Sequence, residues 1–289
     1  MRKRIKKILA SIGLLNIAKK IRYRIYQHKK QWQLNFGDLN VIYDTTDSYS
    51  NRWFYPRYAH GGIHEPGATK IFMDNIEKHS KILDIGGHLG YFTCIAGKLA
   101  AKGSVYVFEV DPKCLHLINK NLRANNLTNV VVNNLAVSDK NETIKIQQYE
   151  SPNPGLVINN NSGDNFIEVK SIRIDDFISQ NNIKPDFIKI DVEGAEWNVL
   201  NGMKHFLAQD NNVVLLIEIH TKHLRQYFNA DYSDCIDLLL KNGFRLKKVD
   251  HRLADGSFLN VDRKTILEGN TMLLCEKHNQ TMIRPTSNE

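Results

Sequence analysis

Acidic side chains follow three apolar runs, at points where they could bind a cationic or hydroxyl-bearing ligand. Asp84 ends the first run, and Glu109 ends the second run 25 residues later. Asp191 and Glu193 come directly after the third run, FIKI. The carboxyl ends of parallel strands meet at one edge of an open α/β sheet, where ligands bind. The sequence therefore predicts one crevice lined by these carboxylates.

The glycines after Asp84 indicate which ligand the crevice takes. Residues 82–92, ILDIGGHLGYF, contain the pattern D-x-G-x-x-x-G, with Gly86 and Gly90 at its two glycine positions. A dinucleotide-binding G-x-G-x-x-G would require glycine at the positions of His88 and Tyr91. A carboxylate at a strand end suits a cationic group, such as the amino group of S-adenosylmethionine, and repels a pyrophosphate. By itself the motif also fits an ordinary glycine turn between a strand and a helix.

Glu109 adds a second requirement on the ligand. An acidic residue at the end of the second strand is the expected acceptor for the ribose hydroxyls of a nucleoside. The alternative is a surface carboxylate that caps the following helix, but Asp111 is better placed for that role, with Pro112 at the first helical position. Together, Asp84 and Glu109 favour a nucleoside-containing cofactor.

Four side chains are candidates for proton transfer. Asp191 and Glu193 follow the fourth predicted strand, and Glu218 and His220 end the fifth, where alternation places both on one face. A carboxylate beside a histidine orients the imidazole and raises its pKa, which suits a general base, although a histidine at a strand end can also be purely structural. Glu196 fits a helix-capping role. The carboxylates could instead hold a divalent ion that lowers a hydroxyl pKa. We predict no metal site, because the sequence places no third ligand.

Strand-like and helix-like segments alternate through the centre of the chain, which predicts a mostly parallel sheet with helices on both faces. The last two predicted strands have no helix between them, so we expect at least one antiparallel strand near the edge. The interval 140–175 lacks helical periodicity and is predicted to be an inserted ribbon and loop. The seven predicted strands lie at Lys81–Ile85, Ser104–Val110, from Val130 onward, Phe187–Ile190, Val213–Ile219, Phe244–Val249 and Thr271–Glu276.

The net charge of +8 belongs to the N-terminal segment. Residues 1–30 hold eleven Lys or Arg and no acidic residue, so the other 28 basic residues face 31 acidic ones. This distribution makes nucleic acid an improbable partner. Residues 1–35 are predicted to form a basic amphipathic helix that docks on an anionic membrane or a partner, or else a solvated arm. We expect an arm over 1–49 and a catalytic domain over 50–289, within which the aromatic, glycine-rich run 50–69 either lines the mouth of the site or covers an edge of the domain.

The chain is predicted to be cytoplasmic, with the inner membrane surface as an alternative through residues 1–35. The stretch after the first basic residues is short, and Lys19 and Lys20 stand where a signal peptide would have its cleavage site. No apolar run approaches the roughly 20 residues that span a bilayer. Four scattered cysteines without metal-binding spacing are typical of a reducing compartment.

Four segments resemble the FkbM family of S-adenosylmethionine-dependent methyltransferases: ILDIGGHLGYFT, VFEVDP, NNLAVSD and, most specifically, IKIDVEGAEWNVLNG. The resemblance covers about residues 65–276. It implies the Rossmann-like class I methyltransferase fold with a seven-stranded sheet. It also implies S-adenosyl-L-methionine as the cofactor and methylation of a hydroxyl oxygen, on a sugar of a bacterial surface glycan or on another small molecule.

The resemblance also assigns roles to single residues. His88 departs from the family pattern, which has a small or amide residue at that position, and the basic N-terminal segment lies outside the pattern. It implies that Asp84, Gly86 and Gly90 bind the methionine end of the cofactor and that Glu109 binds the ribose. It also implies that Asn134 to Ala136 lie near the adenine, and that Asp191 and Glu193 lie at the methyl-transfer site.

Two other functions remain open at this point. A nicotinamide-dependent oxidoreductase is disfavoured because His88 and Tyr91 break the dinucleotide spacing. A non-catalytic, cofactor-binding scaffold of a glycan-assembly complex would retain Asp84 and Glu109 equally well. A base methyltransferase is disfavoured because no Asn/Asp-Pro-Pro-aromatic segment follows the fourth strand.

Overall fold

The computed structural model describes residues 29–58, 62–147, 166–209, 211–252 and 257–277. The chain divides into two compact units, residues 1–64 and 65–289. Residues 1–28 of the predicted amphipathic segment lie outside the described residues. Residues 31–35 belong to a strand, so the helical prediction is wrong there: Trp32 and Leu34 are buried while Gln31 and Gln33 are exposed, which is the two-residue period of a strand.

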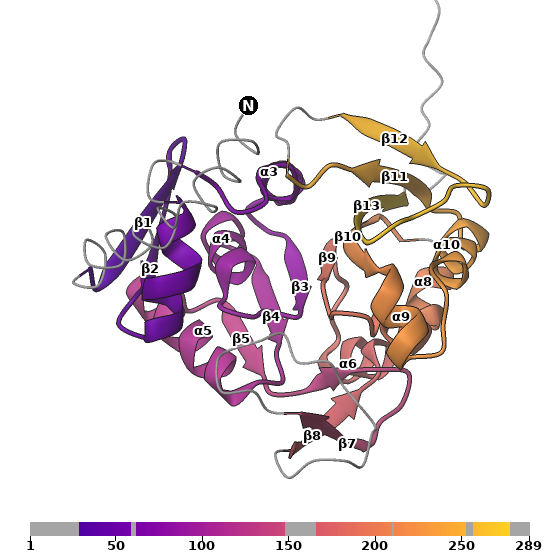
Figure 1. Cartoon of the computed structure of the whole chain (residues 1–289), viewed down its shortest axis with the longest axis horizontal. Coiled ribbons are helices and arrows are strands. Elements are labelled where there is room, and N and C mark those ends of the chain that lie inside the picture. Colours follow the sequence, from indigo (N-terminus) through magenta and orange to yellow (C-terminus); the bar gives the residue numbers. More distant parts are fainter. Residues whose placement is uncertain (1–28, 59–61, 148–165, 210, 253–256, 278–289) are drawn as a thin grey trace, which may run out of the picture. The chain divides into compact units, whose positions relative to one another are not determined.

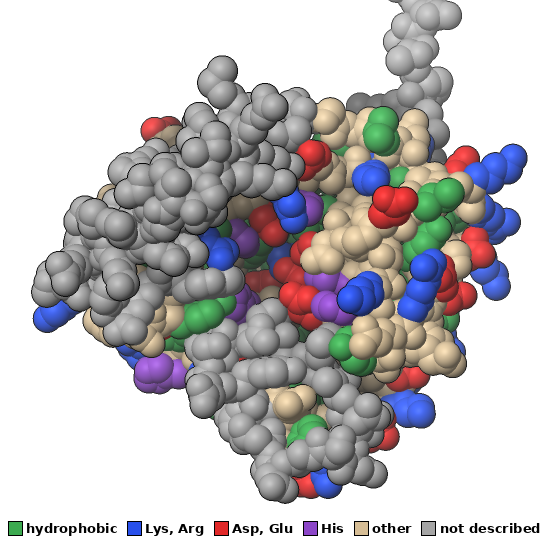
Figure 2. All heavy atoms as spheres, viewed as in Figure 1, with side chains coloured by type: hydrophobic (Ala, Val, Ile, Leu, Met, Phe, Trp, Pro, Cys, Tyr) green, Lys and Arg blue, Asp and Glu red, His purple; other side chains and the backbone are tan. Residues whose placement is uncertain are grey.

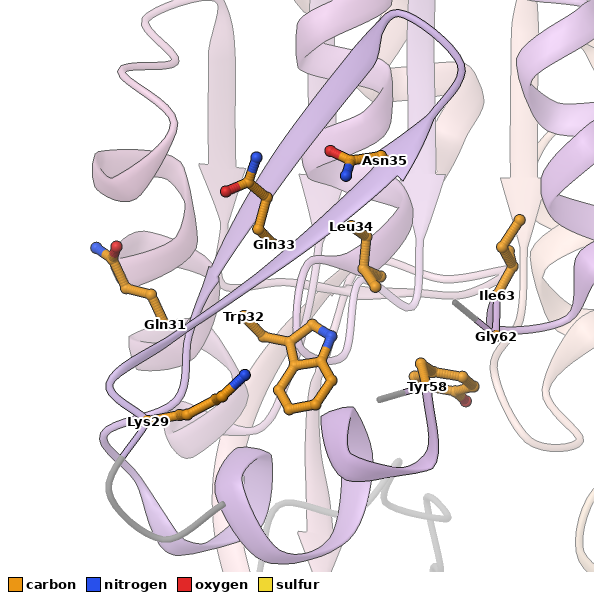
Figure 3. Close-up of a pocket in the computed structure, with 9 residues that line it drawn as sticks. All are labelled: Lys29, Gln31, Trp32, Gln33, Leu34, Asn35, Tyr58, Gly62 and Ile63. Atoms are coloured by element: carbon orange, nitrogen blue, oxygen red, sulfur yellow. The ribbon is translucent and has the colours of Figure 1, made fainter. Parts of the chain in front are cut away.

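The first unit contains an antiparallel hairpin, β1 (Gln31–Phe36) and β2 (Leu39–Asp44). Two short helical turns follow, η1 (Ser50–Phe54) and η2 (Tyr55–Tyr58), in a run whose composition predicts no regular element. The rings of Tyr43 and Tyr55 stack with their centroids 4.8 Å apart, which ties these turns to the hairpin. A cavity of about 390 Å³ lies beside the hairpin, with Trp32 and Tyr58 among the residues that line it (Figure 3).

The second unit is built on an eight-stranded sheet in the order β12-β11-β13-β10-β9-β3-β4-β5 (Figure 1). The five strands from β10 to β5 are parallel, while β13 is antiparallel to both β10 and β11. The predicted mostly parallel sheet with an antiparallel edge is confirmed. The strands are β3 (Lys81–Ile85), β4 (Ser104–Phe108), β5 (Val130–Asn133), β9 (Phe187–Ile190), β10 (Val213–His220), β11 (Arg245–Val249), β12 (Phe258–Val261) and β13 (Asn270–Lys277).

Strand β12 is the one member of this sheet that lies outside the seven predicted strands. It pairs antiparallel with β11 at the edge. Phe258 and Leu259 are 42% and 69% exposed, and only Val261 is buried. The strand FLNV has four residues and buries only the last, so it offers neither a long apolar run nor an alternating pattern from which a strand could be predicted.

Helices cover both faces of the sheet, as predicted. Leu83 and Ile85 of β3 belong to the core formed with α6, α7 and α10. On the other face, the ring of Phe72 contacts the rings of Phe92 and Phe187, which joins α3 and α4 to β9. The helices are α3 (Pro66–Asp74), α4 (Tyr91–Leu99), α5 (Pro112–Ala124), α6 (Ile174–Asn181), α7 (Glu196–Gly202), α8 (Lys204–Ala208), α9 (Thr221–Tyr227) and α10 (Tyr232–Lys241).

Helix α5 begins at the position that its predicted capping residue, Asp111, indicates. The Lys113 N–H donates to Asp111 Oδ1 at 2.8 Å, and Pro112 occupies the first helical position. This leaves Glu109 free of capping and places it in the turn between β4 and α5. The assignment of the cap to Asp111 rather than Glu109 is therefore confirmed.

A small second sheet has the order β6-β8-β7, of which β7 and β8 lie within the predicted insertion over 140–175 and β6 precedes it. Its strands are β6 (Ala136–Val137), β7 (Thr143–Gln147) and β8 (Phe166–Ile172), and β7 and β8 form an antiparallel ribbon. Residues 148–165 between them are outside the described part of the chain. None of the helices in the described ranges has both the length and the apolar character that crossing a bilayer requires.

Candidate active site

The predicted carboxylates lie around the point where the strand order reverses. From β3 the chain continues outward to β4 and β5, and later returns to place β9 on the opposite side of β3. Ligands of open α/β sheets bind at such a switch point, beyond the carboxyl ends of the strands. We use "the crevice" for the site formed there by Asp84, Lys189, Asp191, Glu218 and His220. Figure 2 shows acidic and histidine side chains gathered in a hollow near the centre of the face viewed.

Asp84 presents a carboxylate oxygen without a partner. Its side chain is 1% exposed, and the Thr93 hydroxyl donates to Oδ2 at 2.5 Å. Among the described residues Oδ1 is buried and has no hydrogen-bond donor. Burial raises the pKa of Asp84, and the nearby Lys189 opposes that rise. A buried acceptor without a donor costs roughly 1–3 kcal/mol, so an ammonium group that donates to Oδ1 would be stabilised here. This arrangement fits the predicted cofactor.

Glu109 is held at the end of β4 by backbone N–H groups. Oε1 accepts from Val110 and Asp111 at 2.7 and 2.9 Å, and Oε2 accepts from His88 at 2.7 Å. Burial raises the pKa of Glu109 to about 7, and the three N–H donors limit that rise. The third donor belongs to the glycine turn after β3, so this carboxylate couples the ends of β3 and β4.

The glycine turn contains a histidine in a conformation that favours glycine or asparagine. His88 has φ +49°, in the left-handed region, while Gly90 begins α4 with φ +78°. Burial lowers the pKa of His88 to about 4, so its ring is neutral. The bond to Glu109 comes from the His88 backbone N–H, so a residue of another type at this position would retain it.

We expect His88→Asn to stabilise the protein by about 0.5–1 kcal/mol, because asparagine tolerates the left-handed region better and retains the N–H bond to Glu109. Urea unfolding of the two proteins measures the difference. A loss of stability in the variant would show that the histidine ring contributes packing that outweighs its backbone cost.

Lys189 is a functional candidate that sequence reasoning missed. It is 2% exposed and pairs with Asp84 across β3 and β9 in the sheet register. Its ammonium lies 3.2 Å from Asp191 Oδ2 and 4.8 Å from the centre of the Phe92 ring. Burial opposes both charges, yet their attraction lowers the pKa of Asp191 and raises the pKa of Lys189. The signal was present in the sequence, because FIKI places a lysine inside a fully buried strand.

His220 lies between two carboxylates. Its Nδ1 is 2.8 Å from Glu196 Oε1, and its Nε2 is 3.3 Å from Glu193 Oε2. Glu218 is on the same face, as alternation predicts, and its Oε1 is 4.0 Å from Nε2, so Glu196 and Glu193 are the closer partners of the ring. The expected capping role of Glu196 is only part of its function, because Oε1 also accepts the Gly194 N–H at 2.8 Å.

The charge state of His220 follows from these neighbours. Burial alone lowers the pKa of His220, but the hydrogen bond that its ring donates to Glu196 and the charges of Glu196, Asp191 and Glu193 raise it to about 10. The unliganded protein therefore holds an imidazolium that donates to Glu196 and faces Glu193. The Glu193 carboxylate has its pKa raised by burial and is the member of this group able to take up a proton.

Glu218 lies near two residues that sequence reasoning did not single out individually, Glu65 and His251. One potential ligand atom from each of these three side chains lies within 4.8 Å of the others. Burial and the charge of Asp191 raise the pKa of Glu218 to about 8, and the same two causes raise the pKa of Glu65 to about 7. Glu65 precedes α3 and lies within the run 50–69, one of whose two predicted roles was to line the mouth of the site, whereas His251 follows β11 at a position that no run or spacing marks.

The two residues predicted to lie near the adenine are placed differently from the crevice residues. Asn134 is exposed in the turn between β5 and β6. Ala136 is 5% exposed and packs with Ile146 and Val169 in the core of the small sheet. The structure brings Asp84, Asp191, Glu193, Glu218 and His220 together, while Ala136 belongs to a separate apolar cluster.

The model of the methyltransferase FkbM domain matches residues 84–246, which is more than half of the chain. A hexuronic acid methyltransferase, AglP of Haloferax volcanii, is 26% identical over 157 residues. That match covers 54% of this chain and 62% of the relative, so the chain spans less than two thirds of that protein's length. Methyltransferase 1 of Beauveria bassiana is 24% identical over 190 residues, covering 57% and 72% of the two chains.

Solved structures include an FkbM methyltransferase from Methylobacillus flagellatus, with 15% identity, coverage of 91% of this chain and 60% of that one, and a TM-score of 0.48. The matched residues begin at Asp84 and include Glu109, Asp191, Glu193, Glu218 and His220. The chain therefore belongs to the FkbM methyltransferase family, whose members use S-adenosyl-L-methionine as methyl donor.

Proposed function

We propose that this methyltransferase acts on a hydroxyl oxygen of a sugar or another small molecule. The observation that carries the proposal is the array Glu196–His220–Glu193 beside the crevice, with distances of 2.8 and 3.3 Å. An alcohol is a weak nucleophile at neutral pH, so its methylation benefits from a group that removes the proton. An amine or thiolate acceptor would need such an array less.

The cofactor supplies a methyl group that is already activated for transfer, so the protein has to bind, align and remove a proton. Asp84 Oδ1 would accept from the ammonium of the methionine end, and Glu109 from the ribose hydroxyls. Gly86 and Gly90 would shape the turn that follows β3. We retain the prediction that Asn134 to Ala136 lie near the adenine. Lys189 would neutralise Asp191 and keep that carboxylate ionised at the floor of the crevice.

In this proposal the hydroxyl proton passes to the pair formed by Glu193 and His220. Glu196 is fully buried and holds the His220 ring through Nδ1, which directs Nε2 toward Glu193. Glu193 has φ +54°, an uncommon conformation for a non-glycine residue. This conformation belongs to the loop after β9 and presents the carboxylate to His220. Asp191 and Glu218 contribute two further carboxylates beside this pair.

A sugar is favoured as the acceptor because the matched relative from Haloferax volcanii is a hexuronic acid methyltransferase. The basic segment over residues 1–35 supports docking at an anionic membrane surface or on a partner protein, which would bring a cytoplasmic enzyme to glycan precursors. The same segment fits the alternative of a scaffold in a glycan-assembly complex, and the assay below separates the two. This proposal includes the predicted boundary between an N-terminal arm over residues 1–49 and a catalytic domain over residues 50–289.

The test is methyl transfer by the purified full chain from isotope-labelled S-adenosylmethionine to hexuronic acids, neutral sugars and their lipid-linked forms. We expect acceptor-dependent S-adenosylhomocysteine and a label on oxygen, both abolished in Asp84→Asn. Label found on nitrogen, carbon or sulfur would overturn the O-directed proposal. Tight binding of S-adenosylhomocysteine, together with no turnover on any acceptor in this panel, would favour the scaffold.

The pH dependence of product binding tests the role of Glu109. Because its pKa is about 7, Glu109 is largely protonated at about pH 6 and ionised at about pH 8. The ionised carboxylate has about four acceptor sites, so one remains for a ribose hydroxyl beyond the three N–H donors, whereas the protonated form has none to spare. We expect S-adenosylhomocysteine affinity to rise by up to about tenfold over this range by calorimetry. An equal rise in a folded Glu109→Gln variant would assign the effect to another group.

A further inference from the structure

We propose that Glu65, Glu218 and His251 form a binding site for a divalent cation next to the crevice. They come from three separate places: the residue before α3, the end of β10 and the turn after β11. One ligand atom of each lies within 4.8 Å of the other two. Two carboxylate oxygens and one imidazole nitrogen are a common donor set for Mn²⁺, Fe²⁺ or Zn²⁺.

The second observation is that the two carboxylates have few polar contacts. Glu218 is 6% exposed, and its one close polar contact among the described residues is the 4.0 Å approach to His220. Glu65 Oε2 is buried and has no hydrogen-bond partner within the described ranges. Buried carboxylates are ordinarily paired, hydrogen-bonded or bound to a metal. A cation between them would satisfy both.

The positions of the ligands are fixed by structure that does not depend on an ion. Glu65 has φ +41° at the start of α3, and the Gly67 N–H donates to the His251 carbonyl at 3.0 Å, which ties α3 to the turn after β11. His251 is 7% exposed, and the Arg252 Nε–H donates to its Nε2 at 3.1 Å. That nitrogen therefore has a lone pair, and the exposed Arg252 can leave it without disturbing the core.

A second grouping, Asp191, Glu218 and His220, is also compact. His220 is a poor ligand there, because its Nδ1 and Nε2 already face Glu196 and Glu193 at 2.8 and 3.3 Å. Asp191 is likewise engaged with Lys189. Glu218 belongs to both groupings, and on the side of Glu65 and His251 the competing hydrogen bond to the histidine ring comes from the exposed Arg252 rather than from a buried carboxylate.

The site adjoins the proposed proton-accepting pair, so a cation there would offer open positions to acceptor oxygens. That function rests on the proposed O-methylation, whereas cation binding itself does not. Binding can therefore be tested in the full chain without any acceptor, and its failure would leave the methyltransferase assay unaffected.

The experiment is titration of chelator-treated, full-length protein with Mn²⁺, followed by electron paramagnetic resonance of the free ion. We expect saturable binding of one ion per chain, weakened at least about tenfold in Glu218→Gln and in His251→Gln. Asp237→Asn is the matched control, since Asp237 is an exposed carboxylate on α10 paired with Arg263, and it should bind as the wild type does. Melting curves confirm that each variant is folded.

Three results would overturn the site. One is the absence of saturable Mn²⁺ binding to the folded wild type. Another is an unchanged affinity in Glu218→Gln. The third is an affinity that falls in His220→Asn but not in His251→Gln, because this would place the ion in the other grouping.

Discussion

Replacement of His220 by asparagine is expected to lower the turnover of the enzyme by about 10²–10⁴-fold, the range for loss of a positioned acid–base group. The imidazole lies between Glu196 and Glu193, so its removal leaves Glu193 without the partner that orients it and shares its proton. Binding of S-adenosylhomocysteine should change by less than about threefold, because Asp84 and Glu109 are untouched. Steady-state turnover with the acceptor found in the methyl-transfer screen, together with calorimetry, measures both quantities.

Two variants make this result specific. His205→Asn removes another histidine, one that is 72% exposed and paired with Asp175, and it should retain wild-type turnover. Glu196→Gln keeps the shape of the fully buried side chain while it weakens the hold on Nδ1 and removes a charge that raises the pKa of His220, so its turnover should fall less than that of His220→Asn. A His220→Asn enzyme that binds product normally and turns over within about tenfold of the wild type would rule out the proton-accepting pair.

Gly86→Ala is expected to destabilise the second unit by on the order of 3 kcal/mol or more. A Cβ at position 86 would lie 1.9 Å from the backbone oxygen of Asp191 and 2.9 Å from its carbonyl carbon. The clash involves backbone, and the adjacent bond from the Asp191 N–H to the Ile85 carbonyl, at 3.0 Å, prevents the loops from separating freely. Urea unfolding of the wild type and of the folded Gly86→Ala protein gives the difference in stability between them.

Gly269→Ala is the matched control for this variant. Gly269 has φ +62°, comparable with the +90° of Gly86, but nothing lies within 4 Å of its would-be Cβ. It should therefore show only the backbone cost, about 1 kcal/mol. Equal destabilisation of the two variants would mean that the positive φ, and not the contact with Asp191, explains the glycine.

This contact changes the interpretation of the D-x-G motif. From the sequence, Gly86 is a residue that lets a ligand approach the backbone. In the structure the space beside its Cα is occupied by Asp191, so the glycine is first required for the ends of β3 and β9 to meet. Its role toward the cofactor stays a prediction. The same meeting places Asp84 and Asp191 in one crevice.

The sequence by itself determined the family, the alternating α/β order and the strand ends that carry Asp84, Glu109, Asp191 and His220. These features are local, since apolar period, caps and glycine turns are set by residues a few positions apart. The sequence failed where local signals were weak, as for β12, which buries one residue of four.

Only the tertiary structure decided which side chains meet. Glu196 lies 24 residues from His220, and Glu65 is brought to Glu218 and His251 from the far end of the unit. Spacing along a strand predicted that Glu218 lies on the face of His220, but it did not predict the closer partners Glu196 and Glu193, because their positions depend on a neighbouring helix and loop. The physical reason is that periodicity fixes the direction of a side chain within its own element, whereas contacts between elements depend on packing that closes only when the whole sheet is assembled.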